Sequence, residues 1–148
     1  MNIRVQKGPV QLDSGAVYQG EWMNCMRDGQ GKQEWLDGSR YEGEWREGKA
    51  NGKGKLYHAD GDIYEGDWAS NLMCGYGVYR HANGSVYRGQ WLLGQMHGKG
   101  EDTWPHGEHF LGDYYEGQKE GLGTYLWADG SRFYGQWERN EINGYGMI

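Results

Sequence analysis

Apolar and polar residues alternate over short stretches that recur along the whole chain. Around Tyr41, Gly43 and Trp45 these three residues are two apart, and Glu42 and Glu44 lie between them. In a strand the first three share one face and the two carboxylates share the other, whereas a helix would scatter both sets. The alternation therefore predicts half-buried β-strands.

The stretches recur with a period of 23 residues and without insertion, as in Tyr18, Tyr41 and Tyr64. All 28 glycines fall into five columns with the same period. Glycine at this density excludes helix, because each interior glycine costs about 1 kcal/mol relative to alanine there. A strict period of this length predicts one small unit stacked about six times, in a quasi-linear array.

Each unit is expected to contain two strands, illustrated by Val17 to Met23 and Gly29 to Leu36. The segment Asn24 to Asp28 is expected to be a loop between them. The dipeptide Asp37-Gly38 favours a tight turn with positive φ after the second strand. Joined in this way, the strands predict an all-β fold in one continuous antiparallel meander.

Three aromatic columns supply the expected core, because large rings bury much area and only 36% of the residues are apolar. The first holds Tyr18, Tyr41, Tyr64, Tyr87, Phe110 and Phe133. The second holds Trp22, Trp45, Trp68, Trp91, Tyr114 and Trp137. The third, with Trp35, His58, His81, Trp104 and Trp127, is expected to share the glycine face of the second strand.

The units Tyr41-Glu-Gly-Glu-Trp45 and Tyr64-Glu-Gly-Asp-Trp68, each followed by Gly-x-Gly and Asp-Gly, resemble the MORN (membrane occupation and recognition nexus) repeat. The resemblance covers essentially the whole chain, and residues 107–129 depart most from it. It implies an elongated, twisted sheet of β-hairpins with a groove. It also implies a scaffold that binds partner proteins and often self-associates, in membrane junctions, cilia or the cytoskeleton.

We expect one domain over residues 1–148. It divides into a half-repeat 1–14, repeats 15–37, 38–60, 61–83, 84–106 and 107–129, and a partial repeat 130–148. Pro9 blunts the N-terminal edge, whereas nothing visible protects the C-terminal one. Open edge strands invite pairing, so the C-terminal edge is expected to form a homodimer or to continue into further sequence.

Composition and charge limit the cellular compartment and the classes of partner that are expected. The net charge is −6, with the excess in the C-terminal third, so nucleic acid is a poor partner. Apolar runs are too short for a membrane-spanning helix, and residues 1–8 lack a signal-peptide core. Cys25 and Cys74 are too few for a disulfide framework, which favours a reducing, cytoplasmic setting.

No cofactor, metal site or catalytic residue is expected. His58 and His81 are one repeat apart, roughly 10 Å, too far to share a zinc ion comfortably. Gly52-x-Gly54 lacks the following helix and the Lys-Ser/Thr of a phosphate-binding loop. The remaining candidates are periodic outward carboxylates with no converging Ser or His: Glu42, Glu44, Glu65 and Asp67.

The expected function is to present an aromatic groove to a protein segment, either an extended peptide or an amphipathic helix. Tyr79 and Tyr125 are chosen because their column is otherwise variable, as a recognition column would be. The full set of candidate groove contacts is His58, Tyr79, His81, Trp104 and Tyr125.

One loop edge carries apolar residues in the middle of the array: Leu72, Met73, Leu92, Leu93 and Met96. Two interpretations stay open. An exposed apolar patch with methionine is typical of an adaptable interface. Alternatively, these side chains fold under and cover the aromatic face of the sheet.

A rival function is phosphoinositide binding through a basic cluster in the first two repeats, with Arg46, Lys49, Lys53 and Lys55. Six carboxylates are interspersed there, which favours a solvated, charge-balanced face, and the membrane attraction is expected to be weak. A third alternative is a regulatory repeat domain of a larger protein, because the chain ends abruptly.

Overall fold

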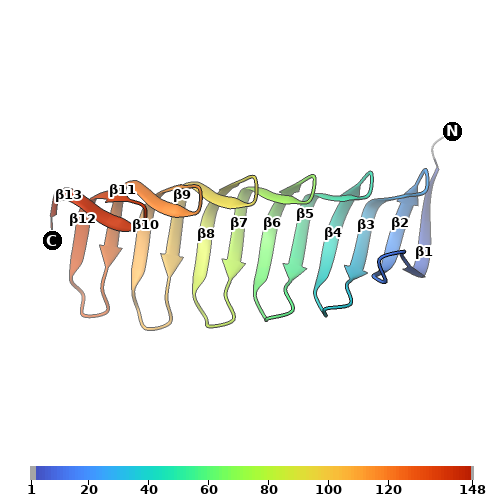
Figure 1. Cartoon of the computed structure of the whole chain (residues 1–148), viewed down its shortest axis with the longest axis horizontal. Coiled ribbons are helices and arrows are strands. Elements are labelled where there is room, and N and C mark those ends of the chain that lie inside the picture. Colours follow the sequence, from blue (N-terminus) through green and yellow to red (C-terminus); the bar gives the residue numbers. More distant parts are fainter. Residues whose placement is uncertain (1–2, 148) are drawn as a thin grey trace.

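The computed structural model describes residues 3–147, and Ile148, at the predicted C-terminal edge, lies outside the described residues. Thirteen strands form one open antiparallel sheet in chain order, which confirms the predicted all-β meander (Figure 1). The strands are β1 (Arg4–Gln11), β2 (Val17–Met23), β3 (Met26–Glu34), β4 (Arg40–Arg46), β5 (Lys49–Tyr57), β6 (Ile63–Ala69), β7 (Leu72–Arg80), β8 (Val86–Leu92), β9 (Gln95–Thr103), β10 (His109–Tyr115), β11 (Gln118–Leu126), β12 (Arg132–Glu138) and β13 (Glu141–Met147). Among residues 3–147 no helix is long and apolar enough to span a membrane.

The two connections of each repeat are the reverse of those predicted. The tight turn lies at Asn24 and Cys25, both with positive φ (51° and 64°), as a two-residue hairpin with matching twist requires. Asp37 and Gly38 instead belong to a five-residue loop. There the Asp37 carboxylate accepts the amide of Ser39 at 2.8 Å, a turn that mimics the backbone. The second strand consequently begins at Met26, three residues earlier than expected.

The two kinds of connection line opposite edges of the sheet (Figure 1). The turn edge is defined by residues 24–25, 47–48, 70–71, 93–94, 116–117 and 139–140. The loop edge is defined by residues 12–16, 35–39, 58–62, 81–85, 104–108 and 127–131. On the turn edge each hairpin is tied to the preceding one, as the Gly48 amide donates to the Arg27 carbonyl at 2.9 Å.

An aromatic ladder built from the first two predicted columns forms the core. Tyr18 packs edge-on between Trp22 and Trp45, with ring centroids 5.1 and 5.4 Å apart, and this arrangement recurs along the array. T-shaped packing suits the opposite charge of ring edge and ring face. The Tyr18 hydroxyl also donates to the Glu21 carbonyl at 2.8 Å. Every ring of the two columns except the partly buried Trp22 is buried, which confirms the columns as the core.

Cross-strand glycine pairs make room for the ladder. Gly20 and Gly31 lie opposite each other on β2 and β3, directly beneath the Tyr18 ring. A Cβ atom on Gly31 would overlap the Tyr18 phenol, so no other residue fits there. Two glycine columns therefore serve the close approach of a ring to the backbone.

The third aromatic column lies at the start of the five-residue loops, just beyond the strand ends, and not within the strands as predicted. Trp35, Trp104 and Trp127 are partly buried and pack against the core from there. Their backbone closes the loop, since the Trp35 amide donates to the Ser39 carbonyl at 2.9 Å. The column thus forms one side wall above the aromatic ladder.

Candidate ligand-binding groove

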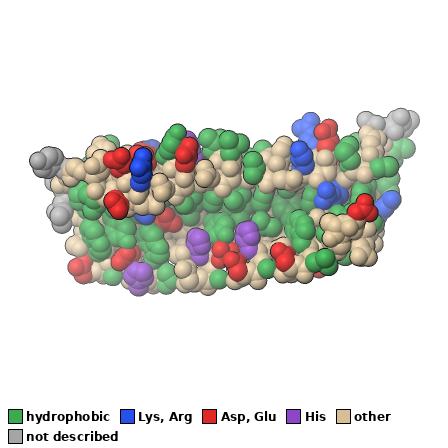
Figure 2. Space-filling model, viewed as in Figure 1, with side chains coloured by type: hydrophobic (Ala, Val, Ile, Leu, Met, Phe, Trp, Pro, Cys, Tyr) green, Lys and Arg blue, Asp and Glu red, His purple; other side chains and the backbone are tan. Residues whose placement is uncertain are grey.

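A groove runs along the face that carries the aromatic ladder, between the loop edge and the turn edge. Figure 2 shows a band of hydrophobic side chains along the length of the molecule. Within the described residues, hollows of this groove are found near the N-terminus and at the centre. The N-terminal hollow has a volume of about 600 Å³ and the central hollow one of about 220 Å³. Each is lined by residues of both edges, for example Ser39 and Gly48 in the first, and His81 and Gly94 in the second.

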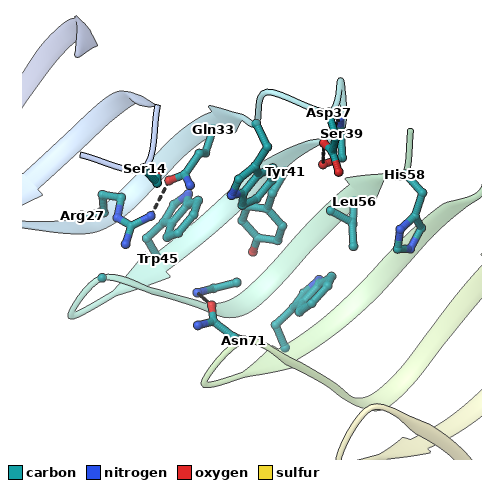
Figure 3. A pocket seen from close by; sticks show the side chains of 14 residues that line it. Ser14, Arg27, Gln33, Asp37, Ser39, Tyr41, Trp45, Leu56, His58 and Asn71 are labelled. Carbon is teal, nitrogen blue, oxygen red and sulfur yellow. Dashed lines mark hydrogen bonds between the residues drawn. The ribbon is translucent and has the colours of Figure 1, made fainter. Parts of the chain in front are cut away.

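The N-terminal hollow contains a cation with a fixed position (Figure 3). The Arg27 guanidinium donates to the side-chain oxygen of Gln33, which is only 3% exposed. Its central carbon lies 4.8 Å from the centre of the Trp45 ring, a cation–π distance. Burial lowers the pKa of Arg27. Among residues 3–147 no carboxylate forms a salt bridge with it.

The opposite wall of the N-terminal hollow is formed by the loop edge. Asp37 accepts hydrogen bonds from the amide and the hydroxyl of Ser39, at 2.8 and 2.6 Å. The hydroxyl of Ser39 lowers the pKa of this carboxyl. His58, a candidate contact, lines the same hollow, and Leu56 forms part of its wall.

Three further candidate contacts lie together in the central hollow: Tyr79, His81 and Met96. The Tyr79 hydroxyl donates to the Asp62 carboxylate at 2.8 Å, and the His81 ring lies 4.6 Å from the Tyr79 ring. Burial raises the pKa of the Tyr79 phenol. Because its hydroxyl is hydrogen-bonded within the protein, Tyr79 presents mainly its ring to a ligand.

The C-terminal part of the groove is filled by its own side chains. Tyr125 lies against Trp104 and Trp137, each at a centroid distance of 5.9 Å, and its hydroxyl donates to Glu108. The candidate contacts Trp104 and Tyr125 are thus in contact with each other and line neither hollow. Burial raises the pKa of Tyr125 to about 12.

An ionic cluster lies beneath this part of the groove. The Tyr114 hydroxyl donates to the Asp102 carboxylate, whose pKa is raised by burial. The Lys119 ammonium lies 5.5 Å from the Trp104 ring and 5.2 Å from the Phe110 ring. Burial lowers the pKa of Lys119, while the charge of Asp102 raises it. Here each half-buried charge has an opposite charge nearby.

The apolar loop residues divide between the two predicted interpretations. Met73 and Met96 fold under and pack against the aromatic core. Leu93 on the turn edge and the adjoining strand residues Leu72 and Leu92 stay exposed, with exposed fractions of 71%, 44% and 49%. Leu72 and Leu93 belong to adjacent hairpins, since the Gly94 amide donates to the Met73 carbonyl at 3.0 Å.

The basic cluster proposed for lipid lies outside both hollows of the groove. Lys53 forms an ion pair with Asp67, and Lys55 lies 5.0 Å from the Tyr57 ring. Arg46 lines a different hollow that also contains Glu21, Asp28 and Glu44. These carboxylates offset much of the positive charge that an anionic lipid would need. Lys49 is exposed opposite Arg46.

Sequence reasoning counted Arg27 only among the basic residues of the first two repeats and did not place it in the groove, although the repeat contains the signal. Within the five full repeats of residues 15–129 its column reads Arg27, Ala50, Met73, Met96 and Lys119, so two cations stand where the other members are apolar. A basic residue at a position that is otherwise buried indicates a special environment. Among residues 3–147 no group of three or more His, Cys, Asp or Glu residues could hold a metal ion.

Comparison with known proteins identifies the repeat family. The family model of the MORN repeat matches residues 18–40, 41–63, 64–86, 87–108, 110–132 and 133–148. No curated protein matches the chain. Among solved structures, the TCP domain of SAS-4 (dCPAP) from Drosophila melanogaster, in complex with a proline-rich motif of Ana2 (dSTIL), is similar at 14% identity and a TM-score of 0.56. The similarity covers 90% of this chain and 76% of that chain, and it concerns the fold.

Proposed function

The chain belongs to the MORN repeat family, and we propose that it is a non-enzymatic interaction scaffold that binds an extended segment of a partner protein along its groove. The observation that carries this proposal is the N-terminal hollow of about 600 Å³, which lies between two edges over an aromatic floor. Concave, largely aromatic surfaces with a few placed polar groups are typical of binding sites. MORN repeats are generally non-enzymatic.

The groove suits a long, narrow occupant. The two hollows follow each other along the groove axis, and the candidate contacts His58 and His81 lie one repeat apart on the same edge. A strand rises about 3.3 Å per residue, so a short extended segment would span both hollows. The TCP domain of SAS-4 was solved in complex with a proline-rich motif of Ana2, and that complex supports a peptide as the proposed ligand of this groove.

The test fills the N-terminal hollow with side chains that the protein already uses elsewhere. The double substitution Ser39→Asp, Leu56→Tyr copies the hydrogen-bonded pair of Asp62 and Tyr79, one repeat further on. Peptides are selected from a random 12-residue library on the native chain, and their affinities are measured by calorimetry. We expect the filled variant to stay folded and to lose the selected peptides.

A matched control adds a tyrosine to the opposite face. The change Gln30→Tyr copies Tyr76, two repeats further on, and Lys32→Gln on the same face lowers the net charge by one, as Ser39→Asp does in the filled variant. We expect this variant to bind the same peptides with native affinity. Equal loss in both variants, or no selected peptide at all, would contradict groove binding. Vesicle binding that disappears when Lys49, Lys53 and Lys55 become Glu would support the phosphoinositide alternative instead.

Self-association is a second part of the proposal. β1 and β13 pair on one side only, so each leaves a free strand edge in the described sheet. We propose one repeat domain that pairs through the C-terminal edge, in a cytoplasmic setting near the cytoskeleton or a membrane. The measurement is sedimentation equilibrium across a dilution series, in which a monomer at all concentrations would contradict the dimer.

A further inference from the structure

We propose that the N-terminal hollow recognises an acidic side chain of the bound segment, with its carboxylate on Arg27 and neighbouring apolar residues in the hollow. The inference rests on the proposed groove binding and adds the chemistry of the partner. It predicts a segment that carries Asp or Glu beside apolar residues.

Arg27 is held in place before any ligand arrives. Gln33 is almost completely buried and accepts one guanidinium donor, while the Trp45 ring supports the planar face. Another nitrogen of the guanidinium faces Gly48 on the turn edge, 3.7 Å from where a Cβ atom would be. A fixed guanidinium retains several donors in a planar arrangement that matches a carboxylate.

The charge of Arg27 is not balanced inside the protein. Gln33 is neutral, and within residues 3–147 the guanidinium forms no salt bridge. Asp37, the one carboxylate among the described residues that lines the hollow, is on the opposite wall and already accepts two hydrogen bonds from Ser39. A partly buried cation without an opposite charge is unfavourable, and an incoming carboxylate would relieve that penalty.

The rest of the hollow fits apolar neighbours of the acidic residue. Trp35, Leu56 and Trp68 contribute apolar surface to its walls and floor. The corresponding cation near the C-terminal end, Lys119, does not form an equivalent site. Asp102 lies near enough to compensate its charge, and Trp104 and Tyr125 occupy the space above.

The experiment selects random 12-residue peptides on the native chain and on Arg27→Met, which introduces the residue that fills this column at Met73 and Met96. On the native chain we expect Asp or Glu at one fixed position beside apolar residues. Replacing that acid by Asn or Gln in a purified peptide should weaken binding by about tenfold, the scale of a charge-assisted hydrogen bond. On Arg27→Met the same replacement should have no measurable effect.

The control is Arg46→Met, which changes the net charge equally but removes an arginine outside both groove hollows. It should preserve the acid preference. Selected peptides without an acidic position, or an acid preference that survives in Arg27→Met, would overturn this inference and leave groove binding intact. If Arg46→Met also abolishes the preference, the effect is one of overall charge and the inference fails. An absence of any selected peptide would overturn both proposals.

Discussion

The two ends of the groove are built from the same repeat and yet differ in what they leave open. Near the N-terminus, Leu56 and Gln33 are too short to cover the ladder, and the N-terminal hollow remains above it. Near the C-terminus, Tyr125 fills the equivalent position and lies against Trp104. One column of variable residues therefore decides whether a repeat offers space or closes it.

A second position changes together with this column of variable residues. Tyr79 donates its hydroxyl to Asp62, and Tyr125 donates to Glu108, each acid standing 17 residues earlier. In the second repeat Ser39 stands at the position of the acid, and Leu56 stands at the position of the tyrosine. A tyrosine at this position is thus accompanied by an acid that satisfies its hydroxyl, in keeping with the cost of leaving a buried donor unpaired.

The largest expected effect concerns the glycine pairs that lie beneath the rings, and it compares one such pair near each end of the groove. In Gly54→Ala, the added Cβ atom would overlap the Tyr41 ring and disturb its hydroxyl, which donates to the Glu44 carbonyl at 2.9 Å. In Gly123→Ala it would meet Phe110, which has no such bond. Overpacking predicts a loss of about 2 to 3 kcal/mol in the free energy of unfolding for the first and about 1 to 2 kcal/mol for the second.

Urea unfolding measures both values, and Gly8→Ala is the control because nothing lies within 4 Å of its Cβ position. We expect the control to change stability by less than about 0.5 kcal/mol. An equally small change in Gly54→Ala would show that the ring does not lie on the glycine pair.

The next effect concerns the middle of the groove. Met96 packs against the core in the column of Arg27, so Met96→Ser should cost about 2 kcal/mol of unfolding free energy. Leu93→Ser, on the exposed turn edge, should change it by less than about 0.5 kcal/mol. Thermal denaturation of the two variants separates them, and equal losses would contradict the division between buried and exposed residues.

The smallest effect compares the two cations directly. In Lys119→Met, Asp102 loses its nearby positive charge, so we expect a loss of about 1 kcal/mol at neutral pH, a modest value because both groups are only half-buried. Within residues 3–147 Arg27 forms no salt bridge with a carboxylate, so Arg27→Met should change stability by less than about 0.5 kcal/mol.

The pH dependence of unfolding checks the assignment. The pKa of Asp102 is raised in the folded protein, so the folded state binds a proton more tightly than the unfolded state does. Stability of Lys119→Met should therefore increase as the pH falls from neutral through this raised pKa toward the ordinary carboxylate range of about 4. Arg27→Met should lack this additional increase. A loss that does not depend on pH would exclude Asp102 as its cause.

The period and the ring columns were enough to predict the meander and its core, because each glycine pair and each ring recurs in register. The turn assignment was wrong for a local reason. Asp-Gly favours a tight turn, but Asp37 instead caps a five-residue loop through Ser39. The N-terminal hollow was missed because it depends on contacts between columns, such as Arg27 with Gln33, which no single column displays.

The chain-order sheet also determines how the scaffold would respond to force. Its ends lie at opposite tips of the array, and the strands run across the long axis (Figure 1). Tension between the tips would act along the backbone hydrogen bonds and separate them one strand at a time, instead of shearing many together. Each 23-residue repeat that opens would release about 75 Å of extended chain. We therefore expect the molecule to yield stepwise at low load, as an extensible spacer, and stretching of single molecules would record the steps.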